Sequence, residues 1–247
     1  MAADLTVAVA STEAAGAKDV PDTAARTTRL ASAEGVPDAE RRRFLDARDG
    51  DKEDGSRMLS LHLAWRAATL PLPAGAPRLG AGLPSMIVRD GAARSGHRIL
   101  VMMAAMYDPA LGDVDTYSNA IAAKMDEILD RSQSEKIVIL ADVRGGEGWA
   151  NPAATSVVPF LRAVSAVMSA NFPERLHQLV VFPVPWVASA LWSVVKQFLD
   201  PLTARKVVLL SGPADRAAPV PASLAEYLDE DTLALIRRHR DEALQGA

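Results

Sequence analysis

The sequence predicts an α/β protein in which a mixed, mostly parallel sheet follows a small N-terminal helical lobe. From residue 85 onward, short apolar runs rich in β-branched residues alternate with longer helical patterns. Before residue 85 the apolar residues recur at helical spacing, and a connector rich in Gly, Pro and Ala separates the two regions. At 247 residues the chain is long enough for one such two-lobed unit.

The N-terminal region divides into a tail and a helical lobe. Residues 1–35 are rich in Ala, Thr and Ser and contain few large apolar side chains, so we expect a disordered tail. In the lobe over 36–80, we expect a short helix at 37–48 and an amphipathic helix at 52–70, which ends at Pro71. The apolar face of the second helix carries Met58, Leu61, His62 and Trp65.

The region over 85–247 carries the predicted sheet and its covering helices. The predicted strands are Ser85–Val88, Arg98–Tyr107, Lys136–Val143, Gln178–Pro185 and Lys206–Ser211. The predicted helices are Asp113–Arg131, Pro152–Ala170, Pro185–Phe198 and Pro221–Leu244. Because long helical segments separate most of the strands, the sheet is expected to be largely parallel.

Composition and charge exclude several classes of function. The net charge of −4 gives no cationic field for nucleic acid, so we expect no nucleic-acid partner. The chain has no cysteine, and no two of its four histidines have metal-ligand spacing, so we expect no metal site. No apolar run is long enough to span a membrane and no signal peptide opens the chain, which predicts a cytoplasmic protein.

The enzyme motifs common in α/β sheets are missing from the sequence. It contains no Gly-x-Ser-x-Gly elbow, no Walker loop and no Gly-x-Gly-x-x-Gly helix start. The nearest feature is the Gly-rich turn Asp142-Val-Arg-Gly-Gly-Glu-Gly148, where backbone amides could approach a phosphate. We interpret it as a tight strand-to-helix turn, and an α/β enzyme that uses Asp142 stays an open alternative.

The stretch from Asn171 to Leu210 carries the most informative motifs. Phe172-Pro-Glu-Arg-Leu176 precedes a strand ending in Pro183-Val-Pro-Trp186, and Lys196-Gln-Phe-Leu-Asp-Pro-Leu-Thr-Ala-Arg-Lys206 follows. In order and spacing these motifs resemble the core of the Sec14-like (CRAL-TRIO) lipid-transfer family. The resemblance, which covers roughly residues 37–233, implies a sheet that forms the floor of a hydrophobic pocket for one lipid. It also implies no cofactor, no catalysis and a monomer.

The resemblance further implies a head-group site for phosphatidylinositol. In family members that bind this lipid, the head group is held by four side chains that correspond here to Arg48, Glu174, Thr203 and Lys206. Arg and Lys neutralise a phosphate, Thr donates a hydrogen bond to it, and Glu accepts from inositol hydroxyls. Because the strand Ile137–Ala141 lacks the hydroxyl side chains of phosphatidylcholine-binding members, we expect little binding of that lipid.

A gate over the acyl chains is the last feature that the resemblance implies. The helix expected from Trp186 to Phe198 is apolar on nearly every side, as a gate or a buried core helix would be. If the helix is a gate, it is expected to contact a membrane surface transiently through Trp186 and Trp192. The predicted gate and acyl-pocket residues are Trp186, Leu191, Trp192, Val195, Phe198, Ile137 and Ile139.

Two departures from the family pattern leave room for a different ligand. Asp-Ala-Arg48-Asp-Gly replaces a more basic segment, and the glycines that usually follow the last strand are missing after Leu233. A carrier of a hydrophobe without a head group, such as a tocopherol, retinoid or sterol, therefore remains an alternative to a phospholipid carrier.

Overall fold

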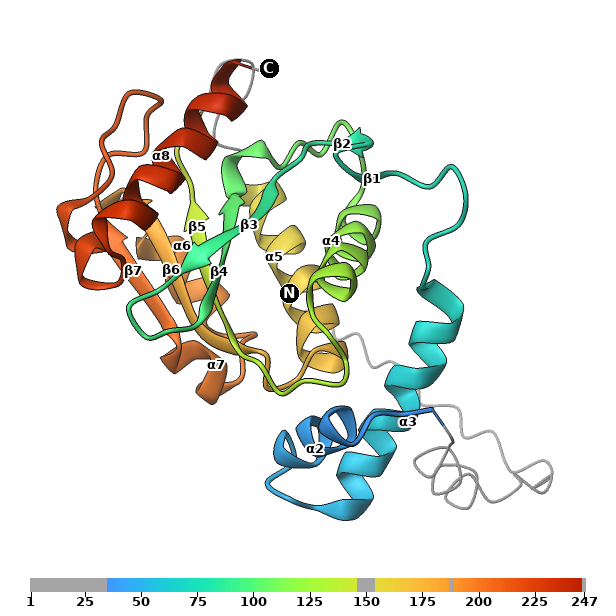
Figure 1. Cartoon of the computed structure of the whole chain (residues 1–247). Helices are drawn as coiled ribbons and strands as arrows, with labels where there is room; N and C mark the ends of the chain where they lie inside the picture. The colour runs from blue at the N-terminus through green and yellow to red at the C-terminus, as the bar shows by residue number, and fades with distance from the viewer. Residues whose placement is uncertain (1–34, 146–153, 187–188, 246–247) are drawn as a thin grey trace, which may run out of the picture.

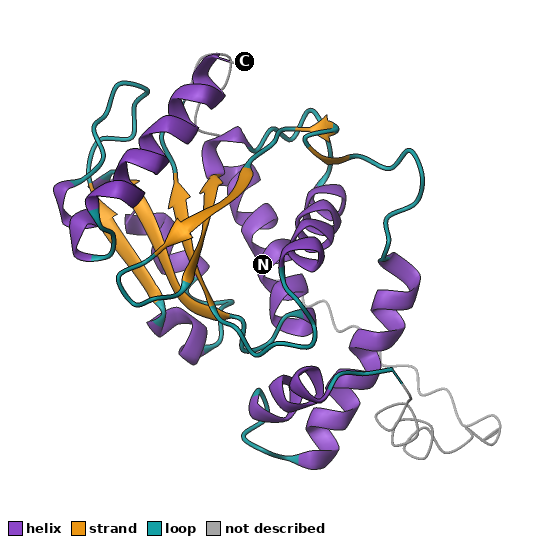
Figure 2. Ribbon diagram, in the orientation of Figure 1, coloured by secondary structure: helices purple, strands orange, loops and turns teal. Residues whose placement is uncertain are grey.

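The computed structural model describes residues 35–145, 154–186 and 189–245 and has two lobes (Figure 1). The predicted tail at 1–35 lies outside the described residues except for its last residue. A pair of helices forms the small lobe, and a sheet with helices on both faces forms the large one (Figure 2). The connector contains two short strands that the sequence did not indicate, β1 (Arg78–Leu79) and β2 (Gly82–Leu83).

The helical lobe consists of α2 (Asp38–Asp46) and α3 (Lys52–Thr69). Helix α3 begins after Asp51, because its carboxylate accepts a hydrogen bond from the backbone N–H of Asp54 at 2.9 Å. The two helices pack closely at Gly55, where a Cβ atom would lie 2.8 Å from a methyl carbon of Leu45. The small core of this lobe contains Val36, Phe44, Met58 and Leu59.

The large lobe contains a five-stranded sheet in the order β3-β4-β5-β6-β7. Strand β3 (Ile87–Ala92) is antiparallel to β4 (Arg98–Met103), while β5 (Ile137–Asp142), β6 (Leu176–Val184) and β7 (Val207–Ser211) continue parallel to β4. The prediction of a mixed, mostly parallel sheet is confirmed. Because β4 to β7 all run the same way, their amino ends meet at one edge of the sheet.

Helices cover the two faces of this sheet (Figure 1). The 3₁₀ helix η3 (Ala222–Glu226), the turn after it and α8 (Glu230–Gln245) contribute Leu224, Leu228 and Ile236, respectively, to a core with one face of the strands. On the opposite face, α4 (Val114–Ile128) and α5 (Ala154–Asn171) pack with β4 and β5, next to the 3₁₀ helix η1 (Ala104–Met106).

Two predicted helices have different boundaries in the structure, and a capping aspartate starts a new helix just after the first segment and inside the second. The segment expected as one helix at 185–198 contains α6 (Ser189–Val195), and a separate helix α7 (Pro201–Arg205) starts where Asp200 caps the N–H of Thr203 at 2.8 Å. The helix expected at 221–244 is split into η3 and α8, since the carboxylate of Asp229 accepts from the N–H of Thr232 and starts α8 afresh.

Candidate functional site

Polar side chains gather where the parallel strands begin. Lys136 immediately precedes β5, Glu174 stands two residues before β6, and Lys206 immediately precedes β7. The Lys136 ammonium donates a hydrogen bond to the Glu174 carboxylate at 2.7 Å. That hydrogen bond lowers the pKa of Glu174, burial opposes the change, and the positive charge of Lys206 lowers the pKa further. Glu174 and Lys206 therefore share one electrostatic environment at this edge.

The backbone at Glu174 adopts an uncommon conformation. Its φ of 57° lies in the left-handed region, which non-glycine residues seldom occupy. The surrounding turn is held by Arg175, whose guanidinium donates to the carbonyl oxygens of Asp130 and Glu135, the latter at 3.0 Å. Strained residues persist when the surrounding structure determines them, and they cluster at binding sites. The Glu174 carboxylate is held beside Lys136, at the amino end of β5.

Helix α7 brings Thr203 and Lys206 to the same edge. Lys206 is the C-cap residue of α7, and its N–H donates to the carbonyl oxygen of Thr203 at 3.0 Å. Its side chain is half-buried, and no ion pair joins it to another residue in the described ranges. The Lys206 ammonium is thus positioned to meet an anion from outside the protein.

The fourth predicted head-group residue, Arg48, lies elsewhere in the described structure. It follows α2 in the helical lobe, is exposed, and donates to the neighbouring carbonyl oxygen of Ala47 at 3.0 Å. Among the described residues, no hydrogen bond or ion pair joins it to Glu174, Thr203 or Lys206. The structure brings three of the four predicted side chains to one edge and leaves Arg48 in the other lobe.

Two histidines at this edge were not singled out from the sequence. The rings of His97 and His177 stack with centroids 3.7 Å apart and planes 14° from parallel. His177 is the extra residue of an irregularity in β6, because Ile137 pairs with Leu176 while Val138 pairs with Gln178. The signal that could have found the pair is position: His97 and His177 each directly precede a predicted parallel strand, and Lys136 and Lys206 are the first residues of two others.

One face of β6 and β7 is apolar but incompletely covered. Leu179 and Val181 of β6 and Val207 and Leu209 of β7 are all half-buried, although they lie within strands of the sheet. Their neighbours on the opposite face, Val180 and Phe182, are both 0% exposed in the core beneath α8. Apolar surface left open beside a polar edge is typical of a site for an apolar ligand.

Helix α6 and its flanks supply the other predicted apolar residues. Val195 is buried, Leu191, Trp192 and Phe198 are half-buried, and the Phe198 ring lies 5.9 Å from the guanidinium carbon of Arg162 on α5. Trp186 is 86% exposed, which is unusual for so large an apolar side chain. Of the two predicted strand residues, Ile139 is half-buried, whereas Ile137 is 1% exposed in the core formed with α4 and α5.

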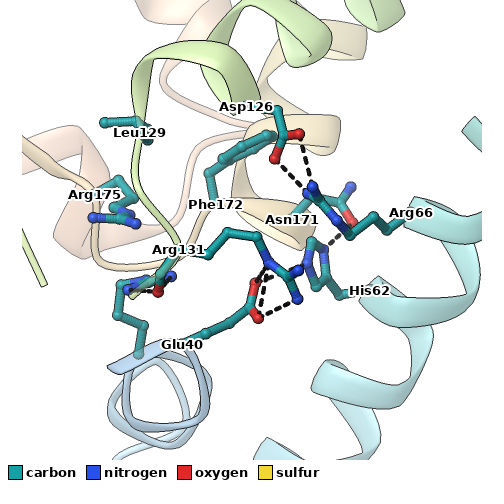
Figure 3. Close-up of a pocket in the computed structure, with 10 residues that line it drawn as sticks. Glu40, His62, Arg66, Asp126, Leu129, Arg131, Asn171, Phe172 and Arg175 are labelled. Carbon is teal, nitrogen blue, oxygen red and sulfur yellow. Dashed lines mark hydrogen bonds and ion pairs between the residues drawn. The ribbon is translucent and has the colours of Figure 1, made fainter. Parts of the chain in front are cut away.

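A buried ionic network joins the two lobes (Figure 3). Arg131 donates to both carboxylate oxygens of Glu40, and the His62 ring nitrogens lie 3.3 Å from Glu40 and 3.0 Å from the Asn171 side-chain oxygen. Burial alone would raise the pKa of Glu40, but hydrogen bonds and charges from His62 and Arg131 lower it to about 2. These residues surround a small gap that is lined from both lobes. The network fixes the helical lobe against the large lobe.

The surroundings of Asp142 disfavour the alternative in which an enzyme uses its carboxylate. Asp142 is 2% exposed and forms ion pairs with Arg144 at 2.6 Å and with Arg240 of α8 at 3.7 Å. A carboxylate held in this way anchors α8 to the sheet and has no free oxygen for substrate. The glycine at 148 lies outside the described residues.

Metal-site clusters and membrane-spanning helices are both absent from the described residues. Within the described ranges, no group of three or more His, Cys, Asp or Glu side chains has the geometry of a metal site. Among the helices of the same residues, none is long and apolar enough to cross a bilayer.

Comparisons with known proteins agree with this architecture. The family model described as the CRAL/TRIO domain matches residues 85–234. The chain is 34% identical over 53 residues to phosphatidylinositol transfer protein CSR1 of Eremothecium gossypii, and 33% identical over 55 residues to the Sec14 cytosolic factor of Schizosaccharomyces pombe. Each match covers 22% of this chain but only 12% and 19%, respectively, of those proteins.

A solved structure supports the fold over most of the chain. The crystal structure of Sfh5 superposes with a TM-score of 0.62 at 17% sequence identity. The superposition covers 80% of this chain and 69% of the other.

Proposed function

This chain belongs to the CRAL/TRIO domain family, whose members bind and transfer lipids, and we propose that it carries or presents one phospholipid, with phosphatidylinositol as the ligand. The observation that carries the proposal is the junction of two surfaces. Lys206 directly precedes Val207, so the polar edge with Glu174 and Thr203 continues into the half-buried apolar face of β6 and β7. A lipid has the same division between a polar head and apolar chains.

The free energies favour transfer rather than catalysis. Each acyl methylene costs about 0.8 kcal/mol in water, so a phospholipid leaves a bilayer only for another apolar environment. On the half-buried face of β6 and β7, the aliphatic side chains Leu179, Val181 and Leu209 provide that environment. The apolar free energies in bilayer and pocket then nearly cancel, and a few head-group hydrogen bonds of about 1 to 3 kcal/mol each select the lipid.

The polar edge supports an anionic inositol head group over choline. Lys206 meets the phosphate, the Thr203 hydroxyl donates to it, and Glu174 accepts from ring hydroxyls. The name of one similar protein, phosphatidylinositol transfer protein CSR1, points in the same direction. Arg48 adds to the site only if the helical lobe approaches the edge when lipid is bound.

Lipid extraction is the experiment that tests this function. Protein purified from cells is expected to contain phosphatidylinositol by mass spectrometry, and to transfer it between vesicles much faster than phosphatidylcholine. Recovery of a sterol, a tocopherol or a retinoid instead would support the carrier of a hydrophobe without a head group. Protein that binds no lipid and transfers none would contradict both.

Membrane contact is proposed to occur through Trp186. At 86% exposure this side chain contributes little to the core, while its indole suits the interface between head groups and acyl chains. The Trp186→Ala variant is expected to bind vesicles about tenfold more weakly and to fold normally, measured by vesicle co-sedimentation and thermal unfolding. Leu61→Ala, which removes another exposed apolar side chain from the helical lobe, is the matched control. Equal loss in both variants would remove Trp186 as the contact residue.

A further inference from the structure

The polar edge contains more cationic groups than one phosphodiester requires. Lys206, without an ion pair to another described residue, is sufficient for a single negative charge. Beside it lie Lys136 and the stacked pair His97 and His177, and both lysines act electrostatically on His177. These three additional side chains come from the starts of three different strands, so their convergence is a property of the fold.

We propose that Lys136, His97 and His177 bind a second phosphate, a monoester carried on the same inositol head group. This inference rests on the proposed function, because it specifies the chemistry of the lipid that the edge accepts. Lys136 now donates to Glu174 at 2.7 Å. When the Glu174 carboxylate accepts hydrogen bonds from inositol hydroxyls, the Lys136 ammonium turns to the monoester phosphate.

The nearby acids leave room for such an anion. The carboxylate of Glu135 is engaged by a bidentate ion pair with Arg98, and that of Asp200 caps α7 through the N–H of Thr203. Glu174 is the remaining acid, and it faces both Lys136 and Lys206. A phosphate dianion therefore meets two lysines and two imidazoles at an edge where Glu135 and Asp200 are held by other groups and Glu174 is held by Lys136 itself.

The histidine pair makes this binding depend on pH. Burial lowers the pKa of His177, and the charges of His97, Lys136 and Lys206 lower it further, so the ring is neutral at pH 7. Two imidazolium rings 3.7 Å apart would repel each other. A phosphate dianion offsets that repulsion and favours proton uptake. Affinity for the monoester therefore rises as the pH falls from 7.5 toward about 6, by at most about tenfold per pH unit for one linked proton. Below that pH the rise levels off, because the free phosphate, with a second pKa of about 6, takes up a proton itself.

A structural role for the ring stack makes a different prediction. Stacking alone requires two flat rings and no N–H groups, and the ring of His97 is already oriented by the Ser95 hydroxyl at 3.0 Å from its Nδ1. The His177→Phe variant keeps a ring at this position and removes the donors. It separates a phosphate ligand from a packing residue.

The experiment compares two lipids in one transfer assay. Donor vesicles contain phosphatidylinositol or phosphatidylinositol 4-phosphate, and transfer is measured from pH 5.5 to 7.5 for the wild-type chain, His177→Phe and Lys136→Met. The wild type is expected to prefer the 4-phosphate at least fivefold and to prefer it more strongly at low pH. Both variants are expected to lose this preference and its pH dependence while they still transfer phosphatidylinositol.

The outcomes separate the two proposals. Wild-type protein that transfers phosphatidylinositol but shows no preference, or a preference that both variants retain, overturns the second phosphate site and leaves the proposed function intact. Protein that transfers neither lipid overturns the function itself. Inorganic phosphate and soluble inositol 1,4-bisphosphate are added as competitors. Inhibition by inorganic phosphate alone at millimolar concentration would assign the site to free phosphate and overturn the lipid assignment.

Discussion

The Lys206→Ala variant is expected to transfer phosphatidylinositol about 10- to 100-fold more slowly than the wild type, with an unchanged fold. The Lys206 side chain is half-buried and forms no ion pair within the described ranges, so its removal leaves no buried charge unpaired. A hydrogen bond to an ionised partner contributes about 1.5 to 3 kcal/mol, which corresponds to this range of affinity. The measurement is transfer of labelled lipid between vesicles, with circular dichroism to check the fold.

Lys124→Ala serves as the matched control for this variant. Lys124 is a partly exposed lysine on α4 that forms an ion pair with Glu127, one helical turn away, at 3.1 Å. Exposed pairs of this kind contribute little to stability. We expect the control to transfer lipid normally. Retained transfer in Lys206→Ala, with the control unaffected, would remove Lys206 from the head-group site.

The Glu40→Gln variant is expected to be less stable than the wild type by about 3 to 5 kcal/mol at pH 7. Glu40 is 2% exposed and meets Arg131 and His62 across the contact between the lobes. Removing one member of a buried ionic network leaves the partners desolvated without a counter-charge. Urea unfolding at pH 7 measures the loss, and Glu53→Gln, at an exposed position of α3, is the control.

The same carboxylate gives wild-type stability a defined pH dependence. The pKa of Glu40 is lowered to about 2 in the folded protein, from an ordinary value of 4.5. Its contribution is therefore complete above pH 4.5 and is lost as the pH falls toward 2. The expected loss is on the order of 3 kcal/mol. Urea unfolding between pH 5 and 2.5 should show a steeper loss for the wild type than for Glu40→Gln, and parallel curves would contradict the assignment.

Much of the fold could be predicted from the sequence, because hydrophobic periodicity and helix-capping residues indicate the same elements there. The apolar strand Ile137–Asp142 and the helix Val114–Ile128 stand near their expected positions, since strong hydrophobic patterns determine them. The errors fall where a local capping residue overrides a long apolar or amphipathic pattern. Asp200 before Pro201 and Asp229 before Thr232 each start a new helix inside or beside a segment that periodicity alone would join.

The site could be predicted only in part, because it depends on how separate segments meet. Glu174, Thr203 and Lys206 follow from family motifs, and the parallel register of β5 to β7 brings them together. The His97 and His177 stack depends on an irregularity in β6 that no sequence pattern marks. The partnership of Glu40 with Arg131 joins residues 91 positions apart, beyond the reach of local patterns.

The difference in burial between the two faces of the sheet affects the stability of the protein. Beneath α8 the side chains of Val180 and Phe182 are completely buried, whereas Leu179 and Val181 on the other face are only half-buried. A lipid bound as proposed would cover this face, and any molecule that binds only the native state raises the free energy of unfolding. The lipid-free protein is then expected to melt at a lower temperature and to be cut faster by proteases than the lipid-bound protein.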